Sequence, residues 1–138
     1  MKPFVTALLL STLLLAGCST GPRIALQQIQ QKRVFKLPRS EVFETVRFFS
    51  VKEGFRLDSF EEESGRIIGH RTQQAAHTND AGKMIIMNLR VLQVDAENSE
   101  VTTRFTFSSV NDALSRDDEE ILVVCYTTLY DNLEQKVK

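Results

Sequence analysis

Two long stretches of the chain carry apolar residues at helical spacing, and the first runs from Ser40 to Glu53. Ser40 is a good N-cap, and Glu41 suits the positive end of a helix. Gly54 follows the stretch and supplies a left-handed stop. The stripe on one side consists of Val42, Phe43, Val46, Phe49 and Ser50. The pattern therefore predicts an amphipathic helix that buries this stripe.

The second helical stretch extends from Ser115 to about Lys136. Ser115 and Asp118 have the spacing of a capping box, and Lys136 suits the negative end of the helix. The acidic run 117–120 lies at the positive end, where four carboxylates are favourable. The predicted apolar face consists of Leu122, Cys125, Tyr126, Leu129, Leu133 and Val137.

Between and before these helices, the apolar residues alternate at the spacing of β-strands. Lys32–Leu37 is short and ends at Pro38, which predicts a strand at the edge of a sheet. Four further strands are predicted over Phe55–Glu62, Arg66–Thr72, Met84–Val94 and Val101–Ser109. The turn Glu63–Gly65 joins the first two of these as a hairpin. In the strand Met84–Val94, the residues predicted to face inward are Ile85, Met87, Leu89 and Val91. In the strand Val101–Ser109 they are Val101, Thr103, Phe105 and Phe107.

The order of elements is strand, helix, four strands, helix. The compact solution for this order is an α+β fold, in which an antiparallel sheet of about five strands carries both helices on one face. The other face of the sheet stays at least partly open. We expect one such domain over residues 32–138, because the chain has 138 residues.

The start of the chain has a different pattern. Lys2 precedes an apolar run from Phe4 to Leu15, which is interrupted only by hydroxyl side chains. This run is too short for a membrane-spanning helix, which needs about 20 apolar residues. Residues 1–17 therefore resemble a secretory signal peptide and take no part in the predicted fold.

The signal peptide ends in Leu15-Ala16-Gly17, followed by Cys18. These four residues resemble the lipobox of bacterial lipoproteins, which implies cleavage before Cys18 and attachment of a lipid to its thiol. The resemblance implies a diacylglyceryl group, usually with an N-acyl chain, and several chains hold far more firmly than one. The alternative interpretation is an ordinary signal peptide in which Cys18 is incidental.

Residues 18–31 are predicted to be a tether that follows the lipidated cysteine. Gly21 and Pro22 disfavour regular structure, and four glutamines keep the segment polar. The residue after the cysteine is Ser19 rather than the aspartate that commonly retains Gram-negative lipoproteins at the inner membrane. In a Gram-negative host, Ser19 therefore favours the periplasmic face of the outer membrane.

Composition narrows the possible partners. The chain has 17 basic and 18 acidic residues, so no basic excess indicates a nucleic-acid partner. Its aromatic residues do not interleave with a basic patch. With Cys18 assigned to the lipid, Cys125 is the remaining cysteine, and no intrachain disulfide is expected.

The element order and three short motifs suggest a family. Val42-Phe43, Gly54-Phe55-Arg56-Leu57 and Ser64-Gly65-Arg66-Ile67-Ile68-Gly69 are similar to a pattern of small bacterial lipoproteins. In element order the chain resembles the helix-grip domains of the BamC (NlpB) lipoprotein, an accessory of the outer-membrane β-barrel assembly machine. The likeness covers roughly residues 34–107 and carries over no catalytic residue. It implies a binding or accessory role.

The residue types that perform catalysis or bind metals are sparse. His70 on a strand and His77 in a loop near Asp80 fall short of the three or four convergent ligands of a zinc site. Cys125 lies within an apolar stripe, so an inert buried thiol is favoured over a nucleophile. The acidic run 117–120 lacks the spaced ligands of a calcium loop. We expect no enzyme activity, metal or cofactor.

Two functional hypotheses remain open. The first is a lipid-anchored accessory subunit of a cell-envelope complex, in which Phe48 and Val51, off the buried stripe, help to contact another envelope protein. The alternative is a small protein that binds an apolar ligand between the sheet and the C-terminal helix. An exposed apolar patch on the outer helix surface favours the first hypothesis, and a cavity between helix and sheet favours the second.

Overall fold

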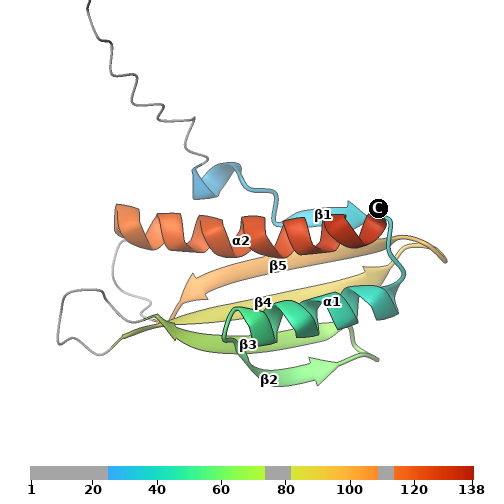
Figure 1. Cartoon of the computed structure of the whole chain (residues 1–138), viewed down its shortest axis with the longest axis horizontal. Coiled ribbons are helices and arrows are strands. Elements are labelled where there is room, and N and C mark those ends of the chain that lie inside the picture. Colours follow the sequence, from blue (N-terminus) through green and yellow to red (C-terminus); the bar gives the residue numbers. More distant parts are fainter. Residues whose placement is uncertain (1–24, 74–81, 109–113) are drawn as a thin grey trace, which may run out of the picture.

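The computed structural model describes residues 25–73, 82–108 and 114–138. Its elements are η1 (Leu26–Gln28), β1 (Lys32–Phe35), α1 (Arg39–Lys52), β2 (Arg56–Glu61), β3 (Arg66–Gln73), β4 (Lys83–Gln93), β5 (Ser99–Phe107) and α2 (Arg116–Val137). The five strands form one antiparallel sheet in the order β1-β5-β4-β3-β2. Both helices lie against one face of this sheet (Figure 1). The predicted α+β class and the order of elements are confirmed, and β1 lies at a sheet edge as predicted.

The core lies between the inner sheet face and the two helices. The alternation of β4 and β5 is as predicted, with every second side chain buried along both strands. The fully buried sheet residues are Ile67, Ile85, Met87, Leu89, Val91, Ser99, Val101 and Thr103. The predicted stripe of α1 is buried throughout. The side chains between these rows lie on the opposite face of the sheet, where Asn88, Arg90 and Arg104 are exposed and Ile86, Thr102 and Thr106 are half-buried.

The prediction of Ser40 as the N-cap of α1 was wrong. The helix begins at Arg39, and Pro38 is the N-cap, with φ −64° and no side-chain hydrogen bond. The carbonyl of Pro38 accepts the N–H groups of Glu41 and Val42, so the fixed φ of proline starts the helix before Ser40.

The predicted stop at Gly54 is confirmed, with φ +75°. The N–H of Gly54 donates to Val51, and that of Phe55 donates to Ser50, which is the Schellman arrangement. The Phe55 ring then stacks on Phe49, with ring centroids 5.8 Å apart. The end of α1 is therefore coupled directly to the core.

The capping box of α2 is present, with Ser115 and Asp118 bonded to each other's backbone N–H groups. The apolar face is buried as predicted except for Val137, which is 42% exposed. Val137 lies a full turn beyond Leu133, the last fully buried residue, where the helix runs past the core. Tyr130 is buried instead, and its hydroxyl donates to the carbonyl of Gln30 at 2.6 Å.

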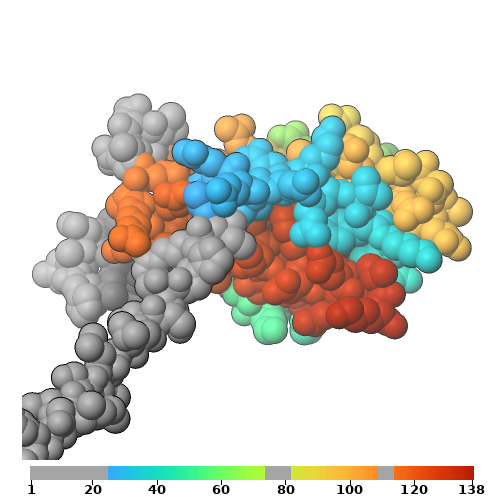
Figure 2. All heavy atoms as spheres, turned by 90° about the horizontal axis from the view of Figure 1, so that it is seen from above, coloured from blue at the N-terminus to red at the C-terminus, as the bar shows by residue number. Residues whose placement is uncertain are grey.

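The last residues of the predicted tether pack on the domain. Figure 2 shows this segment (blue) beside the start of α2 (orange). Leu26 and Ile29 are partly buried against the core, and the Leu26 N–H donates to Glu119 Oε1 at 3.0 Å. The carbonyl of Gln31 accepts the N–H of Thr103 at 2.7 Å, which continues the pairing of β1. Packed structure therefore begins upstream of residue 32.

The hairpin between β2 and β3 turns at Gly65, which has φ +72°. Its carbonyl accepts the N–H of Val91 at 2.7 Å, so this turn lies directly on β4. A Cβ at Gly65 would lie 2.1 Å from the Val91 carbonyl oxygen. At Gly54, which has a similar φ of +75°, a Cβ would meet nothing within 4 Å. A comparison of substitutions at the two glycines therefore separates the cost of a left-handed backbone from the cost of steric overlap.

We expect Gly65→Ala to lower the free energy of unfolding clearly more than Gly54→Ala. The left-handed conformation costs an alanine about 1–2 kcal/mol at either position, and only position 65 adds a clash with β4. Urea unfolding followed by circular dichroism measures both variants. Equal losses would show that the turn moves away from β4 without cost.

Candidate functional site

Two exposed apolar side chains lie on the outer surface of α1. Phe48 is 62% exposed and Val51 is 77% exposed. They are three residues apart and so share one side of the helix, opposite the stripe that packs on the sheet. On α2, Val124 is 57% exposed and lies on the side away from the buried face. The outer surface of the helix layer thus carries apolar groups that the described part of the domain leaves uncovered.

The segment before β1 carries three apolar residues, Ile24, Leu26 and Ile29, that could cover Phe48 from within the chain. Leu26 and Ile29 pack against the core beside α2 instead, while the Phe48 ring stays exposed. Ile24 lies outside the described residues. Within the residues that the structure places, the tether therefore leaves Phe48 and Val51 accessible.

A groove of about 540 Å³ lies between β5 and the first half of α2. Its lining residues are Leu26, Gln31, Ile86, Asn88, Arg104, Phe105, Thr106, Phe107, Leu114, Leu122 and Tyr126. The Tyr126 hydroxyl accepts the N–H of Phe105 at 3.0 Å. Burial raises the pKa of Tyr126, partly offset by the bond from Phe105 and by Arg104, so the hydroxyl stays protonated at neutral pH.

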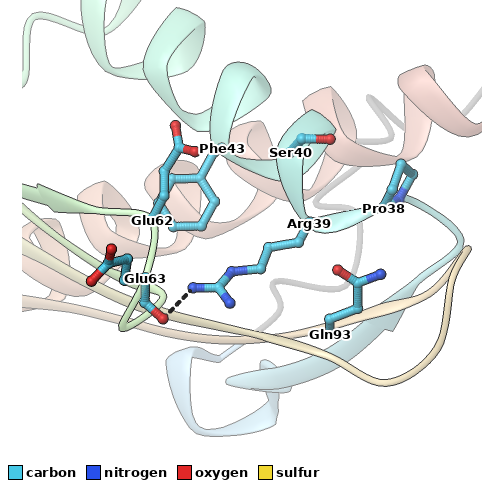
Figure 3. A pocket seen from close by; sticks show the side chains of 7 residues that line it. All are labelled: Pro38, Arg39, Ser40, Phe43, Glu62, Glu63 and Gln93. Atoms are coloured by element: carbon cyan, nitrogen blue, oxygen red, sulfur yellow. Dashed lines mark hydrogen bonds between the residues drawn. The ribbon is translucent and has the colours of Figure 1, made fainter.

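A second hollow, of about 450 Å³, lies at the start of α1 (Figure 3). Arg39 reaches across it from the helix, and its guanidinium donates to the carbonyl of Glu63 at 2.9 Å. Its Nε is buried without a hydrogen-bond partner, and its guanidinium lies 5.7 Å from the centroid of the Phe43 ring. Glu62 and Glu63 also line the hollow. The Arg39 side chain thus joins the helix start to the β2–β3 turn.

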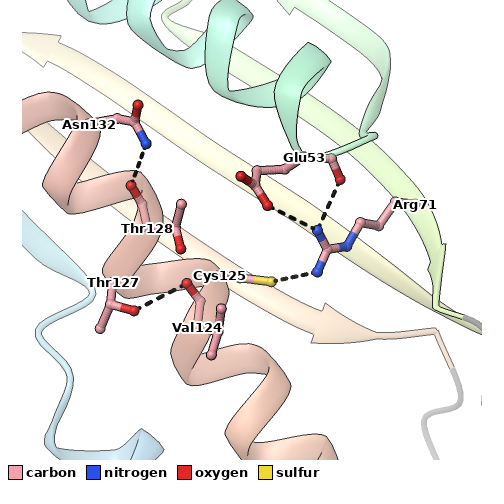
Figure 4. A network of polar contacts seen from close by, with 7 residues as sticks. All are labelled: Glu53, Arg71, Val124, Cys125, Thr127, Thr128 and Asn132. Atoms are coloured by element: carbon pink, nitrogen blue, oxygen red, sulfur yellow. Dashed lines mark hydrogen bonds and ion pairs between the residues drawn. The ribbon is translucent and has the colours of Figure 1, made fainter. Parts of the chain in front are cut away.

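Cys125 lies beside a partly buried arginine (Figure 4). Arg71 donates to the Cys125 Sγ at 3.5 Å and to the carbonyl of Glu53 at 3.0 Å, and it stands 4.9 Å from the centroid of the Phe55 ring. Burial raises the pKa of the Cys125 thiol, and Arg71 offsets only part of this. Cys125 is 3% exposed, which confirms the predicted burial. A protonated, enclosed thiol is a poor nucleophile.

The predicted histidines do not come together in the described residues. His70 pairs with Asp58 across β2 and β3, with Nδ1 and Oδ2 2.7 Å apart on the exposed surface. His77 and Asp80 lie outside the described residues. Among the residues that are described, no three His, Cys, Asp or Glu side chains converge as metal ligands.

The acidic run at the start of α2 stabilises the helix start and its contacts with neighbouring elements. Burial alone would raise the pKa of Asp118, but hydrogen bonds from Lys83 and Ser115 outweigh it and hold that pKa below its ordinary value. The Lys83 Nζ lies 2.6 Å from the Asp118 Oδ2, which fastens the start of β4 to the start of α2. Glu119 accepts the N–H of Leu26.

The predicted lipobox residues Leu15, Ala16, Gly17 and Cys18, and the sorting residue Ser19, lie outside the described residues. Within the part of the chain that is described, neither helix has the length and hydrophobicity needed to cross a bilayer. Neither a protein-family model nor a curated protein matches the chain.

The outer residues of α1 and a hollow between the sheet and the C-terminal helix were both expected from the sequence, but the residues that line the groove were not. Phe48 and Val51 follow from helical periodicity alone. The lining of the groove depends on where β1 begins along β5, with Lys32 opposite Thr102, and this is a tertiary property. Arg104 is recognisable in the sequence as a cation within a strand of alternating side chains. Nothing in the sequence indicates that it lies beside an uncovered sheet edge.

We expect the Cys125 thiol to react slowly with Ellman's reagent in the native protein and rapidly in urea. Its burial and its raised pKa both disfavour the reactive thiolate. A Cys18→Ser variant makes Cys125 the sole thiol, so the absorbance change reports one site. Labelling at the rate of a free thiol under native conditions would contradict an inert structural role.

Proposed function

We propose that this chain is a lipid-anchored, periplasmic, non-catalytic accessory subunit of a cell-envelope complex. The observation that carries the proposal is the exposure of Phe48 and Val51, at 62% and 77%, on a helix whose opposite side is fully packed. Exposed apolar groups on a soluble surface often mark contacts with other proteins. The proposed contact surface is therefore the outer side of α1.

The nucleophiles and bases of the described residues support a non-catalytic role. Cys125 is enclosed and contacts Arg71 rather than a general base. His70 pairs with Asp58 on the surface, 2.7 Å apart, and these side chains stabilise the β2–β3 pairing. Catalysis by an activated nucleophile requires the nucleophile and its base within hydrogen-bond reach of each other.

The anchor is proposed from Cys18 and the residues before it. The described residues begin at Ala25, and a chain of seven residues such as 18–24 can span at most about 25 Å. A lipid on Cys18 would then hold the domain close to the membrane surface. Ser19 supports the periplasmic face of the outer membrane in a Gram-negative host.

We expect Cys18→Ser to abolish acylation and leave the precursor unprocessed, because the lipid is attached to that thiol. Mass spectrometry of the purified protein, together with separation of soluble and membrane fractions, measures both effects. Cys125→Ser is the matched control and should leave acylation intact. Acylated Cys18→Ser protein would overturn the anchor.

We expect Phe48→Ser to leave the melting temperature nearly unchanged and to weaken recovery of the partner from detergent-solubilised envelope. The ring contributes little to stability because it is mostly exposed. Quantitative mass spectrometry of the captured proteins gives the second readout.

Val34→Ser is a matched control for this experiment. Val34 is 59% exposed on β1, a comparable exposure away from the outer surface of α1. It should alter neither readout. A clear loss of melting temperature in Phe48→Ser with unchanged captured proteins would instead assign Phe48 to packing within the chain.

The second candidate function is the binding of a small apolar ligand between sheet and C-terminal helix. The groove between β5 and α2 supports it, since Leu26, Leu122 and Phe107 supply an apolar wall. Asn88, Arg104 and Thr106, beside Ile86, add polar groups on the opposite side, however, and the edge of β5 borders the groove. This lining suits an extended peptide better than an acyl chain.

A further inference from the structure

One edge of β5 is only half covered. β1 pairs with β5 from Ser99 to Thr102, and the carbonyl of Gln31 adds one bond to Thr103. The chain before Gln31 leads away to α2, where Leu26 is bonded to Glu119. In the described part of the chain, no strand pairs with Arg104–Phe107 on this side.

The backbone of this edge presents hydrogen-bonding groups outward. Successive residues of a strand point their N–H and C=O groups to alternate sides. The N–H of Thr103 bonds toward β1 and the N–H of Ser108 bonds toward β4. The backbone N–H and C=O groups of Phe105 and Phe107 therefore point to the uncovered side. The Phe105 N–H is bonded to the Tyr126 hydroxyl. No described residue is shown to bond the Phe105 carbonyl or the Phe107 N–H on this side, and such an edge is a template for another strand.

The groove at this edge has two different sides. Leu26, Leu114 and Leu122 lie toward the helix, whereas Asn88, Arg104 and Thr106, together with Ile86, belong to the open face of the sheet. Side chains of a strand alternate between the two faces of a sheet. A strand added here would place one set of side chains against the leucines and the other set beside Arg104.

The charge of the groove determines which side chains of an added strand are favourable beside Arg104. Arg104 is the sole charged residue among the described residues that line it. The described ion pairs give Arg104 no carboxylate partner, although Lys32, Arg33 and Lys83 each have one. A cross-strand neighbour of opposite charge is favourable at this position. The chemistry of the groove therefore matches a segment in which acidic and apolar residues alternate.

Two short segments of the chain, 19–24 and 109–113, adjoin this edge in sequence, and neither alternates acidic and apolar residues. Residues 109–113 read Ser-Val-Asn-Asp-Ala, with one acidic side chain. Residues 19–24 read Ser-Thr-Gly-Pro-Arg-Ile and contain a cation but no acidic side chain. Pro22 also lacks the N–H that a strand would donate to the edge. The charge of Arg104 thus favours an occupant from another protein.

We infer that the edge Arg104–Phe107 of β5 binds an extended segment of another protein, alternating acidic and apolar residues, by β-strand addition. This goes beyond the accessory role proposed above, because it concerns a different surface and holds whether or not α1 contacts a partner. Main-chain bonds to Phe105 and Phe107 supply affinity, and Arg104 and the leucines supply selectivity.

The test uses the purified full chain in detergent and a fluorescein-labelled peptide in which Glu alternates with Val. A strand of about eight residues, at about 3.4 Å per residue, is longer than the uncovered edge Arg104–Phe107 and can span it fully. Fluorescence anisotropy should give saturable binding. Arg104→Glu should weaken it at least about tenfold, because like charges then lie side by side. The matched control is Arg90→Glu, an exposed residue of β4 on the same sheet face that does not line the groove.

Backbone methylation of the peptide separates strand addition from other modes of binding. N-methyl groups on the amides that face β5 should abolish binding, while the same groups on alternate amides should leave most of it. Amide exchange at Phe107 should slow when the unmethylated peptide binds.

Three outcomes overturn the inference: no saturable binding at millimolar peptide, equal losses for Arg104→Glu and Arg90→Glu, or equal effects of both methylation patterns. Displacement of the peptide by oleate, together with oleate binding that Arg104→Glu leaves unchanged, would assign the groove to a small apolar ligand. Phe48→Ser should not alter peptide binding, so this inference and the proposed contact on α1 fail separately.

Discussion

The structure depends on the burial of one face of β4 and β5 beneath the two helices. Met87, Leu89 and Val101 are fully enclosed there, and they meet Val46 and Leu129, which are equally enclosed on α1 and α2. Since Cys125 is a free thiol, no bond within the described residues cross-links this core. The hydrophobic effect must therefore hold the layers together, at roughly 25 cal/mol for each Å² of apolar surface removed from water. A fold with one packed sheet face necessarily leaves other surfaces available, and these are the surfaces that suggest a function.

Polar contacts fix how the layers meet. Arg71 reaches from β3 to the end of α1 and to Cys125 on α2, and Arg39 joins the start of α1 to the β2–β3 turn. Lys83 and Asp118 join β4 to α2. Each of these side chains spans two elements, so they align helices that apolar packing alone would hold less specifically.

Periodicity in the sequence predicts most of the fold because the side chains alternate cleanly. The buried rows of β4 and β5 and the capping box of α2 are where the pattern places them. The start of α1 was missed because Pro38, rather than a side-chain cap, determines it. The packing of Leu26 and Ile29 was missed because a polar sequence with two apolar residues resembles a tether until tertiary contacts form. The exposure of Phe48 was predictable, but the uncovered edge of β5 was not, since it arises because β1 begins only opposite Thr102.

One wall of the groove is close in sequence to the proposed anchor. Leu26 lines the groove and is only eight positions after Cys18, so a lipid there would place the groove near the membrane surface. A peptide that reaches it would then come from a membrane-proximal segment of its protein. The outer surface of α1 belongs to a different element, with Phe48 opposite the core stripe. If both proposals hold, the domain would contact one partner through side chains and another through its sheet edge, while the short anchor segment keeps both contacts close to the lipid.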